Sequence, residues 1–325
     1  MAKKSIGEFL VASCTPSAGV YRYRLYEDGT AEHLSEIPMP CPMFLALDGD
    51  RLWAVLRAPF SSSDESGLCA YGLLDGKPLT RLLSTKGIVA CHLAVEGADV
   101  YCANYLSGSI FKAPDALRVH SGHGCDKERQ QSPHAHSVVL SPDKKHVICC
   151  DLGLDTVFVY DRSLNLLSQA KTPDGAGVRH AVFSKDEKYL YTVNEMGGSV
   201  SVFSWEAPHL TLLNTVSVLP KDCRGGSGAA IKLSADGKYL YVTERKTESI
   251  ITLRANGAEL DLIARTSSMG KEPRDFTLLA GDRFAVCTNQ FSDSVAVFKI
   301  GTDKIPNYLY SIALDAPLCA VALMP

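Results

Sequence analysis

Five side chains able to bind anions or to move protons are spread through the middle of this 325-residue sequence. They are one histidine, one glutamate and three arginines: His136, Glu195, Arg179, Arg245 and Arg274. An imidazole or a carboxylate can act as a general base that activates water, and guanidinium groups bind carboxylates, phosphates and oxyanions. Gathered in one place, three arginines would leave an excess of positive charge over one glutamate. This set therefore predicts chemistry on a small anionic substrate.

The positions of these residues within a repeated pattern predict that they converge. Five apolar segments align at their last residues: Asn104, Asp151, Asn194, Glu244 and Asn289. The next position holds Tyr105, Leu152, Glu195, Arg245 and Gln290, and sixteen residues earlier stand Val89, His136, Arg179, Ala229 and Arg274. In an antiparallel pair the start of one strand lies beside the end of the next, so these positions are expected around one opening. The same alignment predicts substrate contacts from Asn194, Tyr105 and Gln290.

The elements that must position these residues are recurring β-units. The clearest copies begin at Ser141, Ser184 and Ser234, which lie 43 and 50 residues apart, and another lies near Leu279. Weaker copies run through residues 45–53 and 93–110. Each unit alternates apolar strands with polar turns and has the length of a four-stranded propeller blade. Six internal blades are therefore predicted.

A seventh blade is divided between the two ends of the sequence. Residues 317–324 resemble a first strand with nothing after it, whereas residues 9–14 and 20–26 resemble second and third strands with no first strand before them. Pairing these segments would close a ring and satisfy strand edges that otherwise promote aggregation. We therefore expect an all-β, seven-bladed β-propeller in which residues 1–325 form a single domain. A β-sandwich or tandem all-β domains would not require a divided repeat.

The sequence resembles the cycloisomerase-type 6-phosphogluconolactonase family, seven-bladed lactonases related to carboxy-cis,cis-muconate lactonising enzymes. The resemblance covers essentially the whole chain, and four segments carry it: Pro133-His-Ala-His-Ser-Val-Val-Leu-Ser-Pro-Asp, Val178-Arg-His-Ala-Val-Phe with Tyr189-Leu-Tyr-Thr-Val-Asn-Glu, Ala103-Asn-Tyr-Leu-Ser-Gly-Ser, and Glu272-Pro-Arg. It implies a catalytic set of His136, Arg179, Glu195 and Arg245, with Arg274 in a similar Pro-Arg segment. Two departures, Arg224-Gly-Gly-Ser-Gly and an insert over residues 115–132, could change which substrate fits.

Three functions are compatible with this set of residues. The first is hydrolysis of a 6-phosphogluconolactone-like lactone, with either His136 or Glu195 as the base and Arg179 and Arg245 binding the oxyanion or the anionic group. The second is lactone formation from a dicarboxylate, and the third is a propeller that binds ligands without chemistry. Any single arginine could instead form an ion pair between blades. The set as a whole favours a binding site.

Composition and motifs argue against several other classes of function. A net charge of −3 offers no broad basic face for nucleic acid, and no apolar run reaches the roughly 20 residues needed to span a bilayer. Eleven cysteines without a CxxC pair favour reduced thiols in a cytoplasmic protein. Phosphate-binding Gly loops, the Gly-x-Ser-x-Gly elbow and the dinucleotide fingerprint do not occur, so no nucleotide cofactor is expected.

The insert raises the question of a metal site. Its histidines and cysteine, together with those that follow, have spacings that can suit zinc: His120, His123, Cys125, His134 and His136. Because the surrounding sequence is rich in Ser, Gly, Lys and Gln, a solvated loop is favoured instead. We therefore expect no metal cofactor.

Overall fold

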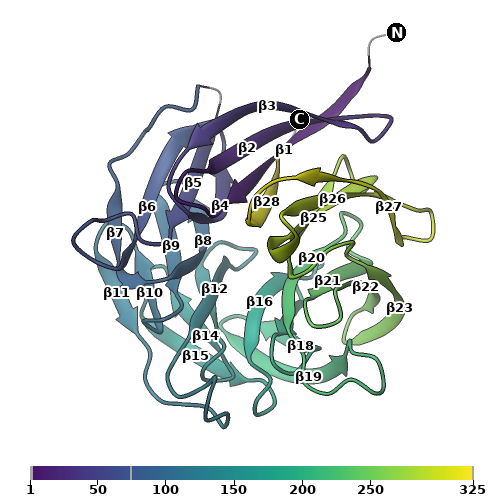
Figure 1. Ribbon diagram of the computed structural model, residues 1–325. Helices are drawn as coiled ribbons and strands as arrows, with labels where there is room; N and C mark the ends of the chain where they lie inside the picture. Colours follow the sequence, from purple (N-terminus) through teal and green to yellow (C-terminus); the bar gives the residue numbers. More distant parts are fainter. Residues whose placement is uncertain (1–2, 74, 324–325) are drawn as a thin grey trace.

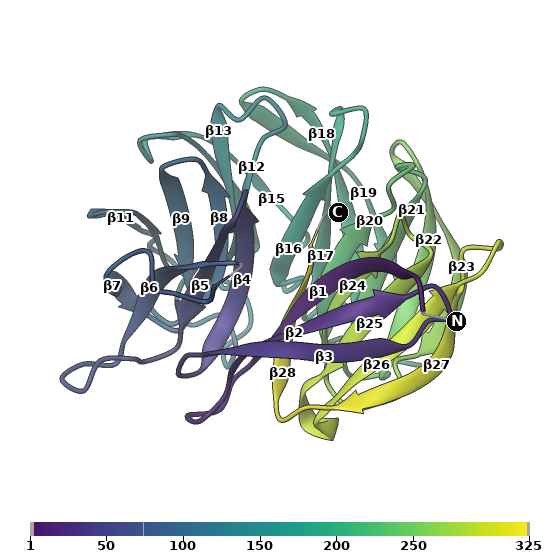
Figure 2. The same cartoon turned by 90° about the horizontal axis from the view of Figure 1, so that it is seen from above.

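Seven antiparallel four-stranded sheets are arranged around a central channel in the computed structural model, which describes residues 3–73 and 75–323 (Figure 1). The seven-bladed β-propeller predicted from the repeats is confirmed. Figure 2, turned by 90° from Figure 1, shows the neighbouring sheets side by side around the ring. The single helical segment in the described residues is a short 3-10 turn, η1 (Gln290–Ser292).

The blades follow one another in sequence, and each runs from an inner strand at the channel to an outer strand. Blade I contains β28 (Pro317–Leu323), β1 (Ser5–Ser13), β2 (Gly19–Tyr26) and β3 (Ala31–Pro38), and blade II contains β4 (Pro42–Asp48), β5 (Arg51–Leu56), β6 (Glu65–Gly72) and β7 (Leu83–Ile88). Blade III contains β8 (Ala90–Glu96), β9 (Asp99–Asn104), β10 (Ser109–Lys112) and β11 (Ala116–Val119), and blade IV contains β12 (Ala135–Leu140), β13 (His146–Asp151), β14 (Thr156–Asp161) and β15 (Leu166–Lys171). Blade V contains β16 (Val178–Phe183), β17 (Tyr189–Asn194), β18 (Ser199–Glu206) and β19 (His209–Ser217), and blade VI contains β20 (Gly228–Leu233), β21 (Tyr239–Glu244), β22 (Ser249–Asn256) and β23 (Glu259–Ser267). Blade VII contains β24 (Pro273–Leu279), β25 (Phe284–Asn289), β26 (Ser294–Ile300) and β27 (Pro306–Ala313).

The Ser-x-Asp motif of the clearest repeats forms the turn between the first and second strands. In blade V the Ser184 hydroxyl donates to Asp186 at 2.6 Å and accepts the backbone N–H of Tyr189 at 2.9 Å. Ser234 makes the equivalent contacts in blade VI at 2.6 and 2.9 Å. A hydroxyl that both donates and accepts holds the turn closed without help from another element. The motif recurs in blades IV, V and VI, where the same turn joins the first two strands.

Ring closure is achieved by the two ends of the chain, as the divided repeat predicts. Strand β28 pairs antiparallel with β1, from Glu8 opposite Leu323 to Ser13 opposite Pro317. Figure 1 shows the yellow β28 beside the purple strands of blade I. The expected strand also included Met324, which lies outside the described residues. This pairing covers the edge of β1 that would otherwise be open and gives blade I the inner strand that the other blades have.

The hydrophobic core lies between neighbouring blades. Phe9 and Val11 of blade I, for example, pack in one cluster with Val286 and Val297 of blade VII, and all four are fully buried. Tyrosines on second strands add a polar link to the following blade: the hydroxyls of Tyr101, Tyr191 and Tyr241 each donate to a carbonyl there at 2.9 Å. Each blade is thus stabilised mainly by its two neighbours, which makes the closing strand important to the whole ring.

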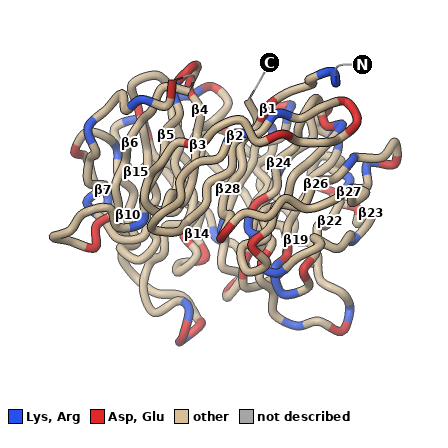
Figure 3. Tube along the Cα trace, turned by 45° about the horizontal axis from the view of Figure 1, so that its top comes forward, with Lys and Arg blue, Asp and Glu red and all other residues tan. Residues whose placement is uncertain are grey.

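The surface is of mixed charge. Figure 3 shows Lys and Arg interspersed with Asp and Glu along the loops and strand ends. In the part of the chain that the structure describes, no helix has the length and apolar character needed to cross a membrane.

Candidate active site

A β-bulge at the start of the inner strand places one side chain from each blade at the same end of the channel. In blade IV, Ala135 pairs with Asp151 and Ser137 with Cys150, which leaves His136 between them without a partner. The other blades show the same irregularity at the second residue of the inner strand. The seven residues are Met43, Cys91, His136, Arg179, Ala229, Arg274 and Leu318. A β-bulge changes the direction in which a side chain points. The bulge in each blade therefore directs these residues toward the channel.

A second ring of seven residues lies beside the first. Each member directly follows the second strand of its blade: Cys14, Arg57, Tyr105, Leu152, Glu195, Arg245 and Gln290. Because the first two strands of a blade are antiparallel, this position lies next to the bulge. All of these residues except Leu152 line a pocket of about 320 Å³, together with Met43, Cys91, His136, Arg274 and Leu318 of the first ring and with Val89 and Arg129.

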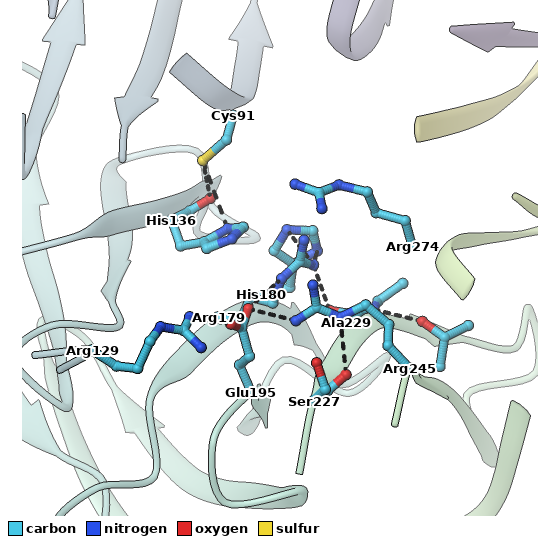
Figure 4. Close-up of polar contacts among 12 residues, drawn as sticks. Cys91, Arg129, His136, Arg179, His180, Glu195, Ser227, Ala229, Arg245 and Arg274 are labelled. Atoms are coloured by element: carbon cyan, nitrogen blue, oxygen red, sulfur yellow. Dashed lines mark hydrogen bonds and ion pairs between the residues drawn. The ribbon is translucent and has the colours of Figure 1, made fainter. Parts of the chain in front are cut away.

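Three arginines surround the carboxylate of Glu195. Arg129 Nη2 donates to Oε1 at 2.6 Å, while Arg245 Nη2 and Arg179 Nε form ion pairs with Oε2 at 2.9 and 3.2 Å. Figure 4 shows Glu195 among these guanidinium groups, with Arg274 across the cluster from Arg129. A second carboxylate, Glu272, contacts Arg245 Nη1 at 2.8 Å. Within this cluster the arginines outnumber the carboxylates.

This arrangement fixes the charge states of the cluster. Burial alone would raise the pKa of Glu195, but Arg245, Arg179 and Arg129 outweigh it and lower that pKa from 4.5 to about 2. Arg179 is 2% exposed and donates from Nη1 to the Ala229 carbonyl at 2.7 Å. Burial, together with the charges of Arg245 and Arg274, lowers the pKa of Arg179 to about 9. At neutral pH the glutamate is therefore an anion and the arginines are cations.

His136 lies in the same pocket as a neutral imidazole. Burial and the charges of Arg179 and Arg274 hold the pKa of His136 well below its ordinary value of 6.5. Its Nδ1 lies 3.7 Å from Cys91 Sγ, and its ring packs edge-on against Tyr105 at 5.3 Å between centroids. Burial raises the pKa of Cys91 to about 12, so this neighbour is a thiol and not a thiolate nucleophile. The uncharged His136 is thus the pocket's unprotonated nitrogen base.

A family model described as a seven-bladed β-propeller lactonase matches residues 8–321. The chain belongs to this lactonase family. It is 33% identical over 308 residues to the protein YwcC of Lactococcus lactis, which covers 87% of this chain and 88% of YwcC. It is 26% identical over 332 residues to a 6-phosphogluconolactonase of Bacillus subtilis, covering 93% of this chain and 94% of that protein.

A solved lactonase structure has the same fold. The periplasmic gluconolactonase PpgL of Pseudomonas aeruginosa superposes with a TM-score of 0.89 at 27% identity, covering 98% of this chain and 99% of that one. The homology supports lactonase activity for this propeller.

The repeat alignment predicted that the expected site residues meet at one end of the channel, and most of them lie together there. His136, Glu195, Arg245, Arg274, Tyr105 and Gln290 line one pocket. Arg179 lies just beside it, in a narrow space that shares Met43, Cys91, Arg274 and Leu318 with that pocket. The sixteen-residue interval was wrong for blade III, where the residue level with His136 is Cys91 and not Val89. The turn between β8 and β9 is shorter, so the interval shrinks there.

Asn194 does not reach the pocket, contrary to the prediction that it contacts substrate. Its side chain is fully buried, and Nδ2 donates to the hydroxyls of Ser199 and Ser201 at 2.9 and 2.8 Å. Successive side chains of a strand point to opposite faces, so a residue next to Glu195 points away from the channel. Asn104 and Asn289 occupy the same position and donate to backbone carbonyls at 3.1 and 2.9 Å. This position is therefore structural in several blades.

Two arginines of the pocket were not identified from the sequence. Arg57 follows β5 and would have been found by extending the alignment to the weak repeat at residues 45–53. Arg129 belongs to the insert and has no counterpart in other blades, so no repeat signal marks it. Its loop is fixed by Gln130, whose side chain is buried and donates to the Leu152 carbonyl at 2.8 Å.

The histidines near the insert have separate structural partners. A solvated loop was expected here, but His120 is buried. Its Nδ1 contacts Asp151 at 2.5 Å and its Nε2 contacts the Tyr160 hydroxyl at 2.9 Å. His134 stacks on Tyr105 at 4.5 Å between ring centroids, while His123 is exposed. The described residues contain no group of three or more His, Cys, Asp or Glu placed to share a metal ion. The buried contacts of His120 hold the base of the loop that carries Arg129.

Proposed function

We propose that this protein hydrolyses a small anionic sugar lactone similar to 6-phosphogluconolactone. One observation carries the proposal: a neutral imidazole shares a pocket with arginines that outnumber its carboxylates. The pocket volume of about 320 Å³ lies in the range of small-molecule sites. Guanidinium groups bind phosphate and carboxylate oxygens in pairs, so the excess charge selects a substrate that carries such a group.

His136 is proposed as the general base. Glu195 is a weaker candidate, because Arg129 occupies one of its oxygens and Arg179 and Arg245 the other, and because its pKa is about 2. The Cys91 thiol donates to the backbone carbonyl of His136 at 3.1 Å, so its sulfur can accept a hydrogen bond from a protonated Nδ1. In that tautomer Nε2 is the nitrogen that accepts a proton. Glu195 would then hold the arginines in place.

The proposed reaction uses these groups in order. Nε2 of His136 removes a proton from water as the water oxygen attacks the lactone carbonyl carbon, and the carbonyl electrons move onto oxygen. Arg245 in the pocket wall donates to this oxyanion, and the charge of Arg179 beneath it adds to the stabilisation. The oxyanion then collapses, the ring C–O bond breaks, and the departing alkoxide takes the proton back from His136. The product is the open-chain acid.

The substrate's own charge would assist the base. An anion bound to the arginines offsets the positive charges that depress the pKa of His136. The pKa of the imidazole then rises toward neutrality, where a general base is most effective. A neutral lactone would lack this assistance and react more slowly.

The test is a panel of three lactones: 6-phosphogluconolactone, glucono-1,5-lactone and muconolactone. Initial rates above spontaneous hydrolysis should be highest for 6-phosphogluconolactone and should fall by about 10² to 10⁴ in His136→Asn. The exposed His209 provides a matched control, and His209→Asn should retain wild-type rates. Turnover of muconolactone alone would favour the lactone-forming reaction run in reverse. No turnover of any lactone, with measurable binding of the open-chain acids, would leave a binding protein and overturn the proposal.

A further inference from the structure

The pocket has two chemically different halves. Blades III to VI supply Tyr105, His136, Glu195 and Arg245, and the loop between blades III and IV supplies Arg129. Blades VII, I and II supply the opposite wall. Glu195 is the single carboxylate among the described residues that line the pocket, and it belongs to the first half. The described residues of the opposite wall therefore include arginines but no carboxylate.

Arg274 is the clearest case of such a charge. Its one polar contact among the described side chains is Nη1 to Oε1 of Gln290, at 3.3 Å. Burial and the charge of Arg245 lower the pKa of Arg274. Arg179 and Arg245, by contrast, each form an ion pair with a carboxylate. A partly buried cation whose contact is a neutral amide costs stability, and a bound anion would recover that cost.

Arg57 stands on the same wall, in blade II. Its backbone is held on both sides, since its N–H donates to the Cys41 carbonyl at 3.1 Å and its carbonyl accepts from the Ser66 hydroxyl at 2.7 Å. Its side chain is exposed at the rim of the pocket and has no ion-pair partner among the described residues.

Cys14 of blade I lies between the two arginines around the ring. Burial and Cys41 raise the pKa of the Cys14 thiol to about 12, against the opposing effect of Arg57 and Arg274. Cys14, Arg57 and Arg274 also line the same pocket. Two cations from blades that flank blade I thus face the same part of the pocket.

We propose that Arg57, Arg274 and Gln290 form a subsite for a terminal oxyanion of the substrate, a phosphate ester or a carboxylate remote from the lactone carbonyl. Each guanidinium can donate two hydrogen bonds to such a group, and Gln290, whose Oε1 accepts from Arg274, still has Nε2 to donate. This assignment rests on the proposed function. It orients the substrate across the channel mouth, with the anion on the wall of blades VII, I and II and the lactone carbonyl toward His136.

The test compares lactones with and without the terminal anion. For Arg57→Ala and Arg274→Gln, the ratio of kcat/KM for 6-phosphogluconolactone to that for glucono-1,5-lactone should fall about 10- to 100-fold, the effect of losing one charge-assisted hydrogen bond. Arg81→Ala removes an exposed arginine outside the pocket and controls for net charge. If this kcat/KM ratio is the same in Arg57→Ala and Arg274→Gln as in Arg81→Ala, the proposal is overturned. Arg274→Lys keeps the positive charge but lacks the planar guanidinium group that donates paired hydrogen bonds. It replaces Arg274→Gln in the test if that variant does not fold.

A binding measurement separates this proposal from the proposed function. Calorimetry with 6-phosphogluconate, glucarate and gluconate, which share a carbon chain, requires no turnover. Tighter binding of the first two than of gluconate, lost in Arg57→Ala and Arg274→Gln, supports the subsite even if no lactone is hydrolysed. Whichever of 6-phosphogluconate and glucarate binds more tightly then shows whether the subsite prefers a phosphate ester or a carboxylate. Equal affinity of the wild type for all three would overturn the subsite.

Discussion

Replacing Glu195 with glutamine tests whether one carboxylate organises the whole site. The substitution keeps the shape of the side chain but leaves one oxygen and one NH₂ group where two charged oxygens stood. Arg129 contacts one of these oxygens, and Arg179 and Arg245 contact the other. Whichever way the amide turns, its NH₂ group faces at least one guanidinium donor. The buried Arg179, the half-buried Arg245 and the exposed Arg129 then lose their shared counter-ion.

The size of the effect follows from this geometry. Removing one partner of a buried ion pair costs about 3 to 5 kcal/mol. For a chain of this length, such a loss lowers the melting temperature by roughly 4 to 7 °C. A carboxyl group with a depressed pKa stabilises the fold above its unfolded pKa and loses that contribution as pH falls. With pKa values of 4.5 unfolded and about 2 folded, the difference between wild type and variant should be complete at pH 7 and shrink below about pH 4.5.

Activity and binding should separate in this variant. The guanidinium groups lose their alignment, so kcat should fall about 10²-fold, as when an oxyanion donor is removed. Binding of 6-phosphogluconate should persist, because the positive charge of the pocket increases. Calorimetric melting, steady-state kinetics and titration with 6-phosphogluconate measure the three quantities, and Glu259→Gln is an exposed control. A lower melting temperature with unchanged kcat would make Glu195 purely structural. Unchanged stability and unchanged kcat together would refute the reasoning.

Three further predictions concern the ring, its pH dependence and the loop. Deleting residues 317–325 removes β28 from blade I, so we expect little soluble protein and no cooperative melting transition; an unchanged melting temperature would contradict closure by this strand. Three histidines at the channel are held neutral by depressed pKa values: His92, His136 and His180. Because the unfolded chain binds protons below about pH 6.5 that the folded ring does not, urea midpoints should fall between pH 7.5 and 5, and a rise would contradict this sign. Arg129→Ala should raise the pKa of Glu195 and weaken binding of 6-phosphogluconate about tenfold, measured by calorimetry, whereas Lys127→Ala in the same loop should bind as wild type does.

Repetition explains how much of the site could be predicted. Equivalent positions in equivalent blades lie at equivalent places around the ring, so the alignment of His136, Arg179, Glu195 and Arg274 carried three-dimensional information. It failed for Asn194 because adjacent side chains of a strand face opposite sides. That failure was avoidable, since the alternation of faces is itself a property of the sequence.

The repeats were enough to predict the seven-bladed ring, its closure by the two ends of the chain, and the end of the channel where the polar residues gather. Which charges neutralise one another could be learned only from the folded chain. The fold set Arg129, from a loop without a repeat counterpart, against Glu195, and left Arg274 with an amide for a partner. Strand pairing and burial depend on local periodicity, which a sequence displays. Electrostatic pairing depends on distances between side chains far apart in the chain, and a loop such as that of residues 120–134 takes its course from contacts with other blades.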